Sequence, residues 1–381
     1  MNLTLSAEEA LIQATARDFA DKELAPLASS IDQKGAIPRD ILEKMAALGF
    51  LGMLTPEAYG GVGLTNLALA LVQLEINRAC ASTGVTMSVH NSLCQSPILR
   101  FGSEEQKHKY LPRLARGEWI GAYSLTEPVS GTDAAALITT ATKDGSDYVI
   151  NGTKNFVTNG GFADVFVLFA RTDPSPAAKQ TGISAFIVEK TLEGLTVGKA
   201  EKKMGIRGSS TTSLFFDGCR VPAANLLGTE GDGLKIALST LDGGRVGIAS
   251  QATGIAMACL DASIKYAKER KQFDRPIGDF QAIQWKIAEM ATDIDAARLL
   301  IFRAARMRDA GEPHTREASM AKLFASTMAN KHANQAVQIH GGVGYIKDFP
   351  VERYFRDAKI TEIYEGTSEV QRIVVARSLL K

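Results

Sequence analysis

The chain has 381 residues, 45% of them apolar and 22% charged, which is the composition of an ordinary soluble globular protein. Its 43 basic and 42 acidic residues leave a net charge of +1, and this balance argues against a nucleic-acid-binding protein. Four cysteines without C-x-x-C spacing and five scattered histidines argue against a disulfide scaffold and a metal site. No stretch approaches the roughly 20 apolar residues that cross a bilayer, so we expect no membrane span.

The first third of the chain, residues 1–120, reads as helical. Apolar residues recur there at three- and four-residue steps, for example at Leu64, Leu67, Leu71 and Leu74. Residues 121–232 change to β-rich runs separated by polar turns. Within YVINGTKNFV, Asn151-Gly152 predicts a type I′ turn and hence a β-hairpin.

From residue 233 to residue 381 the chain reads as helical again. A coiled-coil-like seam predicts a long bundle helix, and its members are Phe280, Ile283, Ile287, Met290, Ile294, Ala297 and Ile301. A later helix, about 316–338, is expected to end at Gly341-Gly342. The order helical, β, helical favours an α+β protein with three domains, 1–120, 121–232 and 233–381.

Near the C-terminus, IYEGTSEVQR places the carboxylate of Glu365 in a short break between two helical segments. Ser368 and Gln371 have the spacing of a capping box that would start the last helix. A carboxylate in such a position suits general-base catalysis beside a developing negative charge. From this segment alone, a solvated loop acid or a cap of the last helix is the favoured interpretation of Glu365.

Four further polar segments are candidates for ligand binding. The Gly- and Thr-containing stretch 122–133 offers hydroxyl groups and unhindered amides, or is simply a turn. Phe156 and Thr158 share one strand face, where they could hold a flat heteroaromatic ring or form an ordinary sheet surface. Arg270 at a helix junction could hold a pyrophosphate or be solvated. A buried Arg245 would need an anionic partner, either Asp242 or a ligand.

Together these segments resemble the acyl-CoA dehydrogenase family along essentially the whole chain and in the family's order. YSLTEPVSGTD is similar to its Y-x-x-T-E-P-x-x-G-[ST]-D motif, and FVTNG to the flavin-contacting W-I-T-N-G. QIHGGVGY is similar to Q-x-x-G-G-x-G-Y, and RDAKITEIYEGTSEVQR to the closing motif that carries the base. Fragments of a dinucleotide fingerprint at Gly61 and Gly342 do not follow a clear parallel strand, so a Rossmann site is not expected.

The resemblance implies a helical N-terminal domain, a middle antiparallel β-domain and a C-terminal four-helix bundle, assembled as a homotetramer that is a dimer of dimers. It implies FAD as cofactor, an acyl-CoA thioester as substrate and an electron-transfer flavoprotein as acceptor. Glu365 would remove the thioester α-proton while a hydride leaves the β-carbon for flavin N5. The flavin would be lined within one subunit by Tyr123, Leu125, Thr126, Thr132, Phe156 and Thr158.

The remaining implied contacts fall into three groups. Residues that would contact FAD across a subunit interface are Arg270, Gln272, Phe273, Gln338 and Gly342, and the cofactor set also includes Gln281 and Gly341. Thr367 and Glu369 would lie near the adenine end. Acyl-CoA contacts would come from Thr132, Asp242, Arg245, Gly366 and Arg377.

Some family branches carry the base just before the arginine of the LDGGR-like segment, where this chain has Gly244. The acid at Glu365 therefore resembles the short- and medium-chain arrangement, and a short- or short-branched-chain enzyme is expected. Pocket depth near 86–93 and 241–249 would set the chain length. Alternatives are a medium-chain enzyme, an acyl-CoA oxidase, a flavin monooxygenase or a flavin-free assembly protein. The expected location is the bacterial cytoplasm, or the mitochondrial matrix for a processed eukaryotic chain.

Overall fold

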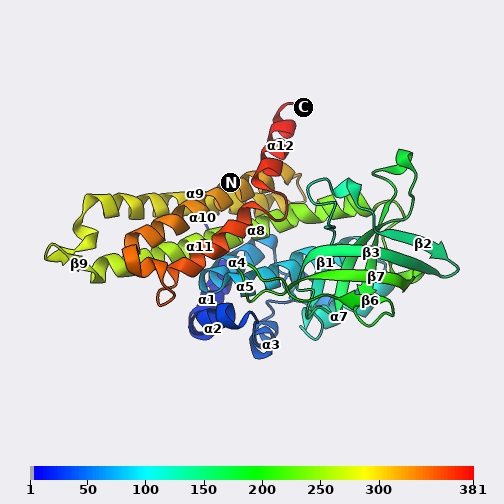
Figure 1. Cartoon of the computed structure of the whole chain (residues 1–381), viewed down its shortest axis with the longest axis horizontal. Helices are drawn as coiled ribbons and strands as arrows, with labels where there is room; N and C mark the ends of the chain where they lie inside the picture. Colours follow the sequence, from blue (N-terminus) through cyan, green and yellow to red (C-terminus); the bar gives the residue numbers. More distant parts are fainter. Residues whose placement is uncertain (1–3) are drawn as a thin grey trace.

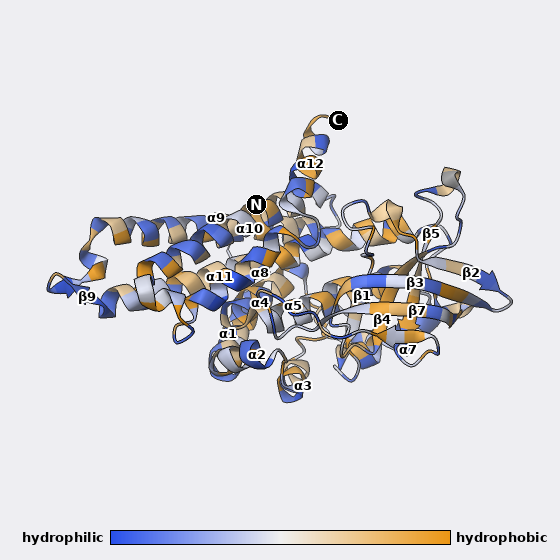
Figure 2. Cartoon of the chain, in the orientation of Figure 1, coloured by the Kyte–Doolittle hydropathy of each residue, from blue (hydrophilic) through white to orange (hydrophobic). Residues whose placement is uncertain are grey.

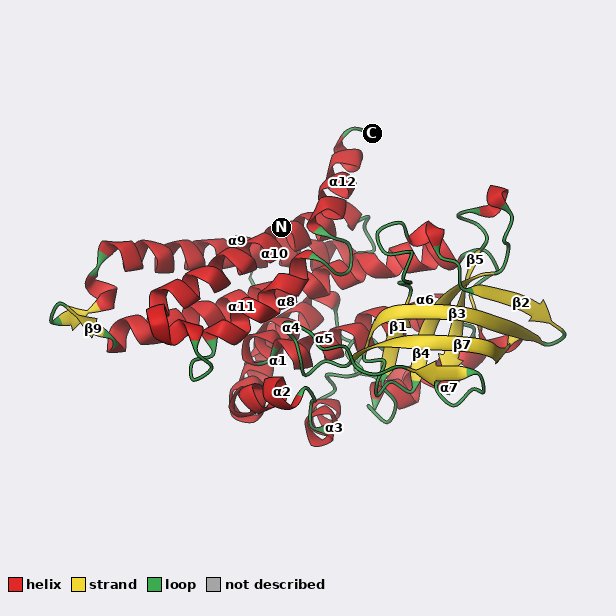
Figure 3. Cartoon of the chain, viewed as in Figure 1, coloured by secondary structure: helices red, strands yellow, loops and turns green. Residues whose placement is uncertain are grey.

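The computed structural model describes residues 4–381 and separates strands from helices along its length (Figures 1 and 3). The sheet lies at one end, and long helices extend to the other. The N-terminal helices are α1 (Ala7–Phe19), α2 (Ala28–Lys34), α3 (Arg39–Ala47), α4 (Asn66–Ala79), α5 (Ala81–Ser88), α6 (Ser96–Phe101) and α7 (Glu104–Ala115), with a π-helix at Val89–Gln95. The fold class predicted from the sequence is confirmed in these three parts: helical, β, helical.

Local sequence explains where several of these helices begin. A capping box starts α1, because the Ser6 hydroxyl accepts the Glu9 N–H while the Glu9 carboxylate accepts the Ser6 N–H. Ser103 and Gln106 form the same box at α7. The whole of α4 lies against neighbouring helices, so most of its side chains are buried.

The middle region forms an eight-stranded sheet with the order β6-β7-β3-β2-β4-β5-β8, and β1 pairs with β4. The strands are β1 (Gly121–Ser124), β2 (Thr140–Asp144), β3 (Asp147–Thr158), β4 (Val165–Arg171), β5 (Ile183–Glu189), β6 (Leu195–Val197), β7 (Thr211–Pro222) and β8 (Leu226–Leu227). β4 is buried on both faces except at its last residue, and Figure 2 shows it in hydrophobic colours. The sheet is mixed rather than wholly antiparallel, since β1 runs parallel to β4 and β2 meets β4 in parallel at one residue pair.

The predicted hairpin turn at Asn151-Gly152 is wrong. The chain turns at Gly145, between β2 and β3, where φ is 61°. Asn151 and Gly152 lie inside β3, at a bulge in its pairing with β7. A Cβ on Gly152 would lie 2.5 Å from Thr139 Oγ1, so the glycine serves a close backbone approach and not a turn.

The C-terminal region is built on α8 (Gly233–Glu269), α9 (Gln281–Asp309), α10 (Thr315–His340), α11 (Val351–Lys359) and α12 (Ser368–Leu379). A small hairpin, β9 (Lys271–Gln272) and β10 (Arg275–Pro276), joins α8 to α9. The apolar seam predicted for α9 is confirmed from Met290 onward, where Met290, Ile294 and Ile301 are buried. α10 stops at Gly341, which has a φ of 63°, as expected.

Glycines let α8 lie unusually close to the N-terminal helices. A Cβ on Gly254 would lie 2.6 Å from the carbonyl oxygen of Leu74 on α4. One on Gly247 would lie 2.5 Å from the Ser88 hydroxyl on α5. The N-terminal helices and the bundle therefore share one core, to which α4, α8 and α10 all contribute.

All four cysteines are buried and free, and burial raises the pKa of each thiol, that of Cys94 to about 12 and that of Cys219 to about 11. Such thiols are poor nucleophiles, in agreement with the inert role expected from their spacing. Within residues 4–381, no helix has the length and apolar character needed to cross a membrane.

A fully buried ion pair fastens the loop between β1 and β2 to β3. Lys154 Nζ lies 2.6 Å from Glu127 Oε1 and also donates to the Leu125 carbonyl at 3.1 Å. The Glu127 carboxylate accepts the N–H groups of Ile138 and Thr139 as well. Burial alone would raise the pKa of Glu127, but these cationic and N–H partners outweigh it and lower the pKa.

Replacing Lys154 with methionine would leave the Glu127 charge buried without its cation. We expect Lys154→Met to lower the free energy of unfolding by about 3–5 kcal/mol, measured by urea denaturation. Arg220→Met is the control, because the Arg220 pairs with Asp144 and Asp147 lie at the surface. If the two variants lose the same stability, the buried pair does not have this role.

Candidate functional site

Glu365 lies in the segment between a 3₁₀ turn, Ile360–Glu362, and α12. The cap of α12 is Thr367, whose side-chain oxygen accepts the Val370 N–H at 3.4 Å. The predicted capping box of Ser368 and Gln371 is therefore wrong by one residue. Gln371 instead turns back and donates to the Gly366 carbonyl at 2.8 Å, so it secures the segment that carries Glu365.

The backbone at Glu365 has a left-handed conformation. Its φ is 53°, and that of Gly366 is 91°. A left-handed conformation costs about 1–2 kcal/mol for a residue with a Cβ, so tertiary contacts must hold it. Lys322 on α10 donates to the Gly366 carbonyl at 2.7 Å, beside the bond from Gln371. These two bonds fix the turn.

This turn places the Glu365 carboxylate on the glycine surface of α8. A Cβ on Gly244 would lie 2.0 Å from Glu365 Oε2 and 3.0 Å from Leu93 Cδ2. Oε2 is buried and has no hydrogen-bond partner among the described residues. Gly244, the alternative base position considered from the sequence, thus lies directly against Glu365, and an acid there would occupy the same space.

The surroundings of Glu365 oppose its ionisation. Burial raises the pKa of Glu365 to about 7, and the positive charges of Lys322 and Arg245 reduce this effect. Burial, together with the nearby charge of Glu365, also raises the pKa values of Tyr123 and Tyr364 well above their ordinary range. The site therefore holds a carboxyl group that can gain or lose a proton near neutral pH.

Arg245 has the anionic neighbour that the sequence suggested. Its Nη1 lies 2.7 Å from Asp242 Oδ1 and 3.3 Å from the Ser319 hydroxyl. Asp242 also accepts the Thr315 hydroxyl at 2.6 Å. Arg245 Nε is buried without a partner in the described part of the chain, so one N–H remains for a ligand.

The residues predicted at the sheet lie around the start of the middle region. Tyr123 on β1 reaches α8, where its hydroxyl donates to the Ala237 carbonyl at 3.3 Å. On β3, Phe156 is 64% exposed with a φ of 55°, and Thr158 is partly exposed, while Val157 between them is buried. Both side chains reach the surface, but a bulge between Lys154 and Val157 interrupts the alternation of β3, so the period-two pattern used to predict a shared face does not hold at Phe156. Leu125 and Thr126 are partly buried and Thr132 is exposed on the loop that follows β1.

A second group of predicted residues lies at the opposite end of the molecule. The β9–β10 hairpin is at the far end of the bundle from the sheet (Figure 1). Phe273 in its turn is 88% exposed, and a Cβ added to Gly341 or Gly342 would have no heavy atom within 4 Å. The members of this group are exposed, and they are Arg270, Gln272, Phe273, Gln281, Gln338, Gly341 and Gly342. Within one chain, this group is therefore distant from the predicted flavin residues on the sheet.

Thr367 and Glu369 follow Glu365 directly, whereas Arg377 is exposed about two and a half turns further along α12. Leu93 belongs to the segment 86–93 that was expected to set the pocket depth, whereas Lys322 is a site residue that the sequence reasoning missed. Lys322 lies on the buried face of α10 together with Ala318 and Ala325. A lysine among apolar residues at helical spacing is unusual, and this pattern could have indicated a site residue from the sequence. Within residues 4–381, no cluster of His, Cys, Asp and Glu side chains has the arrangement of a metal site.

Comparisons with known proteins support the order of the three domains along the chain. Three family descriptions match in order: "Acyl-CoA dehydrogenase, N-terminal domain" over residues 6–118, the middle domain over 122–219 and the C-terminal domain over 231–380. The chain is 51% identical to the mouse protein named short-chain specific acyl-CoA dehydrogenase, mitochondrial, over 97% of this chain and 90% of that protein.

Two solved structures are similar over their whole length. Butyryl-CoA dehydrogenase from Megasphaera elsdenii superposes with a TM-score of 0.97 and 45% identity, covering 100% of both chains. A chain in a structure described as the electron transferring flavoprotein of Acidaminococcus fermentans superposes with a TM-score of 0.98 and 49% identity, again covering 100% of both chains. This protein belongs to the acyl-CoA dehydrogenase family and is an oxidoreductase of that class.

Proposed function

We propose that the protein oxidises a short- or short-branched-chain acyl-CoA to the trans-2-enoyl-CoA, with Glu365 as the base that removes the α-proton. The observation that carries this proposal is the buried, unpartnered Oε2 of Glu365, held against Gly244 with a pKa near 7. A solution carboxyl with a pKa of about 4.3 would be too weak a base. Desolvation supplies the missing basicity.

The residues present fit FAD as the cofactor. An exposed aromatic ring and a neighbouring hydroxyl, Phe156 and Thr158, form a surface suited to a flat ring system. The other contacts with the flavin within one subunit would come from Tyr123, Leu125, Thr126 and Thr132. When bound there, FAD would supply the hydride acceptor for the substrate β-carbon. Phe156 is smaller than the tryptophan of many family members, so its stacking area is smaller.

Residues of this chain then orient the thioester. The left-handed turn directs the Glu365 N–H, and we infer that this N–H would donate to the thioester carbonyl. Bound FAD would supply a second donor. These donors stabilise the enolate-like charge that develops as the proton leaves for the carboxylate. Gly366 leaves room for the thioester, and Asp242, Arg245, Thr132 and Arg377 contact the acyl-CoA.

The exposed group at the far end of the bundle supports a homotetramer arranged as a dimer of dimers. The residues that would contact the FAD of a neighbouring subunit are Arg270, Gln272, Phe273, Gln281, Gln338, Gly341 and Gly342. Thr367 and Glu369 would lie near the adenine end of the cofactor. The separation of this group from β3 in one chain is the reason for placing it across an interface (Figure 1). An electron-transfer flavoprotein would accept the electrons, in the bacterial cytoplasm or the mitochondrial matrix.

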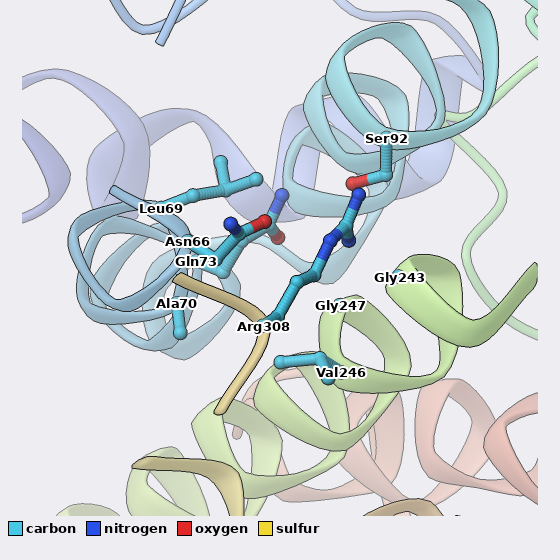
Figure 4. Close-up of a pocket in the computed structure, with 9 residues that line it drawn as sticks. All are labelled: Asn66, Leu69, Ala70, Gln73, Ser92, Gly243, Val246, Gly247 and Arg308. Carbon is cyan, nitrogen blue, oxygen red and sulfur yellow. The ribbon is translucent and has the colours of Figure 1, made fainter. Parts of the chain in front are cut away.

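The short chain length is supported by tight packing beside the base. Leu93 and Ser88 close the surface of α8 next to Gly244 and Gly247. A separate cavity of about 10 Å³ beside Gly243 and Gly247 has space for one water molecule (Figure 4). Its lining residues are Asn66, Leu69, Ala70, Gln73, Ser92, Gly243, Val246, Gly247 and Arg308.

Glu365→Gln removes the base but keeps the size of the side chain. We expect kcat for butyryl-CoA, measured with a dye acceptor, to fall by about 10²–10⁴-fold, while the flavin absorbance of the purified protein persists. Glu312→Gln, which changes an exposed loop acid, is the control. Wild-type turnover in Glu365→Gln would overturn the assignment.

The acidic limb of the kcat/KM profile reports the base in the free enzyme. The base must be ionised to act, so kcat/KM should rise as the pH increases through about 7, the pKa to which burial raises Glu365. Profiles of butyryl-CoA turnover between pH 5 and 9 test this expectation. A limb near pH 4.5 would mean that the Glu365 carboxyl group is solvated in the free enzyme.

Leu93→Ala should enlarge the space beside Gly244. We expect the ratio of kcat/KM for octanoyl-CoA to that for butyryl-CoA to increase roughly tenfold or more. The panel should include C4, branched C5, C6, C8 and C16 substrates, with and without oxygen, because oxygen-dependent turnover would favour an oxidase. Leu111→Ala, at a buried leucine of α7 in another core, controls for lost stability and should leave the ratio unchanged.

A further inference from the structure

Lys322 is a buried cation that no part of the proposed reaction uses directly. Its side chain has no solvent exposure, and its one hydrogen bond among the described residues goes to the Gly366 carbonyl at 2.7 Å. No carboxylate of the described chain pairs with it. A buried ammonium without an ion-pair partner is costly, so a lysine at this position calls for a specific explanation.

The position of Lys322 relative to Glu365 explains why a lysine is buried there. The segment from Glu365 to Gly366 is left-handed, and the Gly366 carbonyl accepts hydrogen bonds from Lys322 on α10 and from Gln371 on α12. Removal of either donor would loosen the turn. The direction of the carboxylate follows from this turn, because Glu365 Oε2 has no partner of its own.

The charge of Lys322 acts on the same group. Burial lowers the pKa of Lys322 to about 8, while the negative charge of Glu365 raises it and the positive charge of Arg245 lowers it further. Glu362 before the turn and Glu369 on α12 are the other acids that act on the ammonium, and both favour its charged form. The nearest cations acting on Glu365 are Lys322 and Arg245.

We propose that Lys322 is a positioning residue for the base: its ammonium fixes the Gly366 carbonyl, and thereby the turn that aims Glu365 at Gly244, and its positive charge favours the carboxylate form of Glu365. The Lys322 ammonium bonds the Gly366 carbonyl and not the Glu365 carboxylate. It acts through Glu365, and the inference therefore rests on the proposed function.

Two substitutions separate the hydrogen bond from the charge. Lys322→Met removes both, and we expect a fall in kcat of about 10–100-fold, because the carboxylate is no longer held in place. The acidic limb of kcat/KM should also move upward by about one pH unit, since a nearby positive charge no longer favours the ionised base. Lys322→Arg keeps the charge and a donor, and should return the limb to the wild-type position.

Gln371→Met is the matched control. It removes the other donor to the same Gly366 carbonyl without changing a charge, so kcat should fall while the acidic limb stays in place. Flavin absorbance and the tetramer peak in size-exclusion chromatography verify that each holoenzyme is assembled. If Lys322→Met does not assemble, the comparison of Lys322→Arg and Lys322→Gln with the wild type gives the same test, because Gln retains a donor without the charge.

If the acidic limb of kcat/KM keeps its wild-type position in an assembled Lys322→Met or Lys322→Gln enzyme, the proposed role of the charge is wrong. An unchanged kcat in Lys322→Met would overturn the role in positioning. Both results are distinguishable from failure of the proposed function, because Glu365→Gln would then still abolish turnover. Retained turnover in Glu365→Gln would instead reject the base itself, whatever Lys322 does.

Discussion

The site depends on a carboxylate packed against the backbone of a helix. Glu365 reaches α8 where Gly244 has no side chain, and any Cβ there would overlap the carboxylate oxygen. The contact removes water from the carboxyl group and leaves Oε2 without a partner, which together raise its basicity. The neighbouring Gly247 serves the same packing, because it lets α5 approach α8 and close the space beside the base.

Two buried glutamates show how the environment sets the chemistry. Glu127 and Glu365 are both removed from water, yet their pKa values move in opposite directions. Glu127 has a direct ammonium partner and two backbone N–H donors, which stabilise its charge and make it a structural anchor. Glu365 has cations nearby but no direct partner, so desolvation dominates. The first is suited to holding the loop after β1, and the second to moving a proton.

The long bundle separates two sets of exposed polar groups. β1 and β3 belong to the sheet end of the molecule, whereas the β9–β10 hairpin lies at the far end of α8 (Figure 1). A ligand that uses both sets must span two copies of the chain. The proposed tetramer is therefore a consequence of the cofactor contacts as well as of the exposed apolar side chains, such as Phe273 and Trp285, that one copy leaves uncovered.

The sequence by itself determined the order of helical and β regions, the long seam of α9, the end of α10 at Gly341 and the carboxylate that lies between α11 and α12. These follow from local periodicity and from glycine at helix ends, which need no knowledge of distant contacts. The motif order also identified the family. The hairpin at Asn151-Gly152 and the cap at Ser368 were wrong because a bulge against β7 and the contacts of Gln371 decided those positions. Only the tertiary structure brought Gly244, Leu93 and Lys322 to Glu365, since these residues are separated by up to 272 positions (93 to 365) and local propensity carries no information about such pairs.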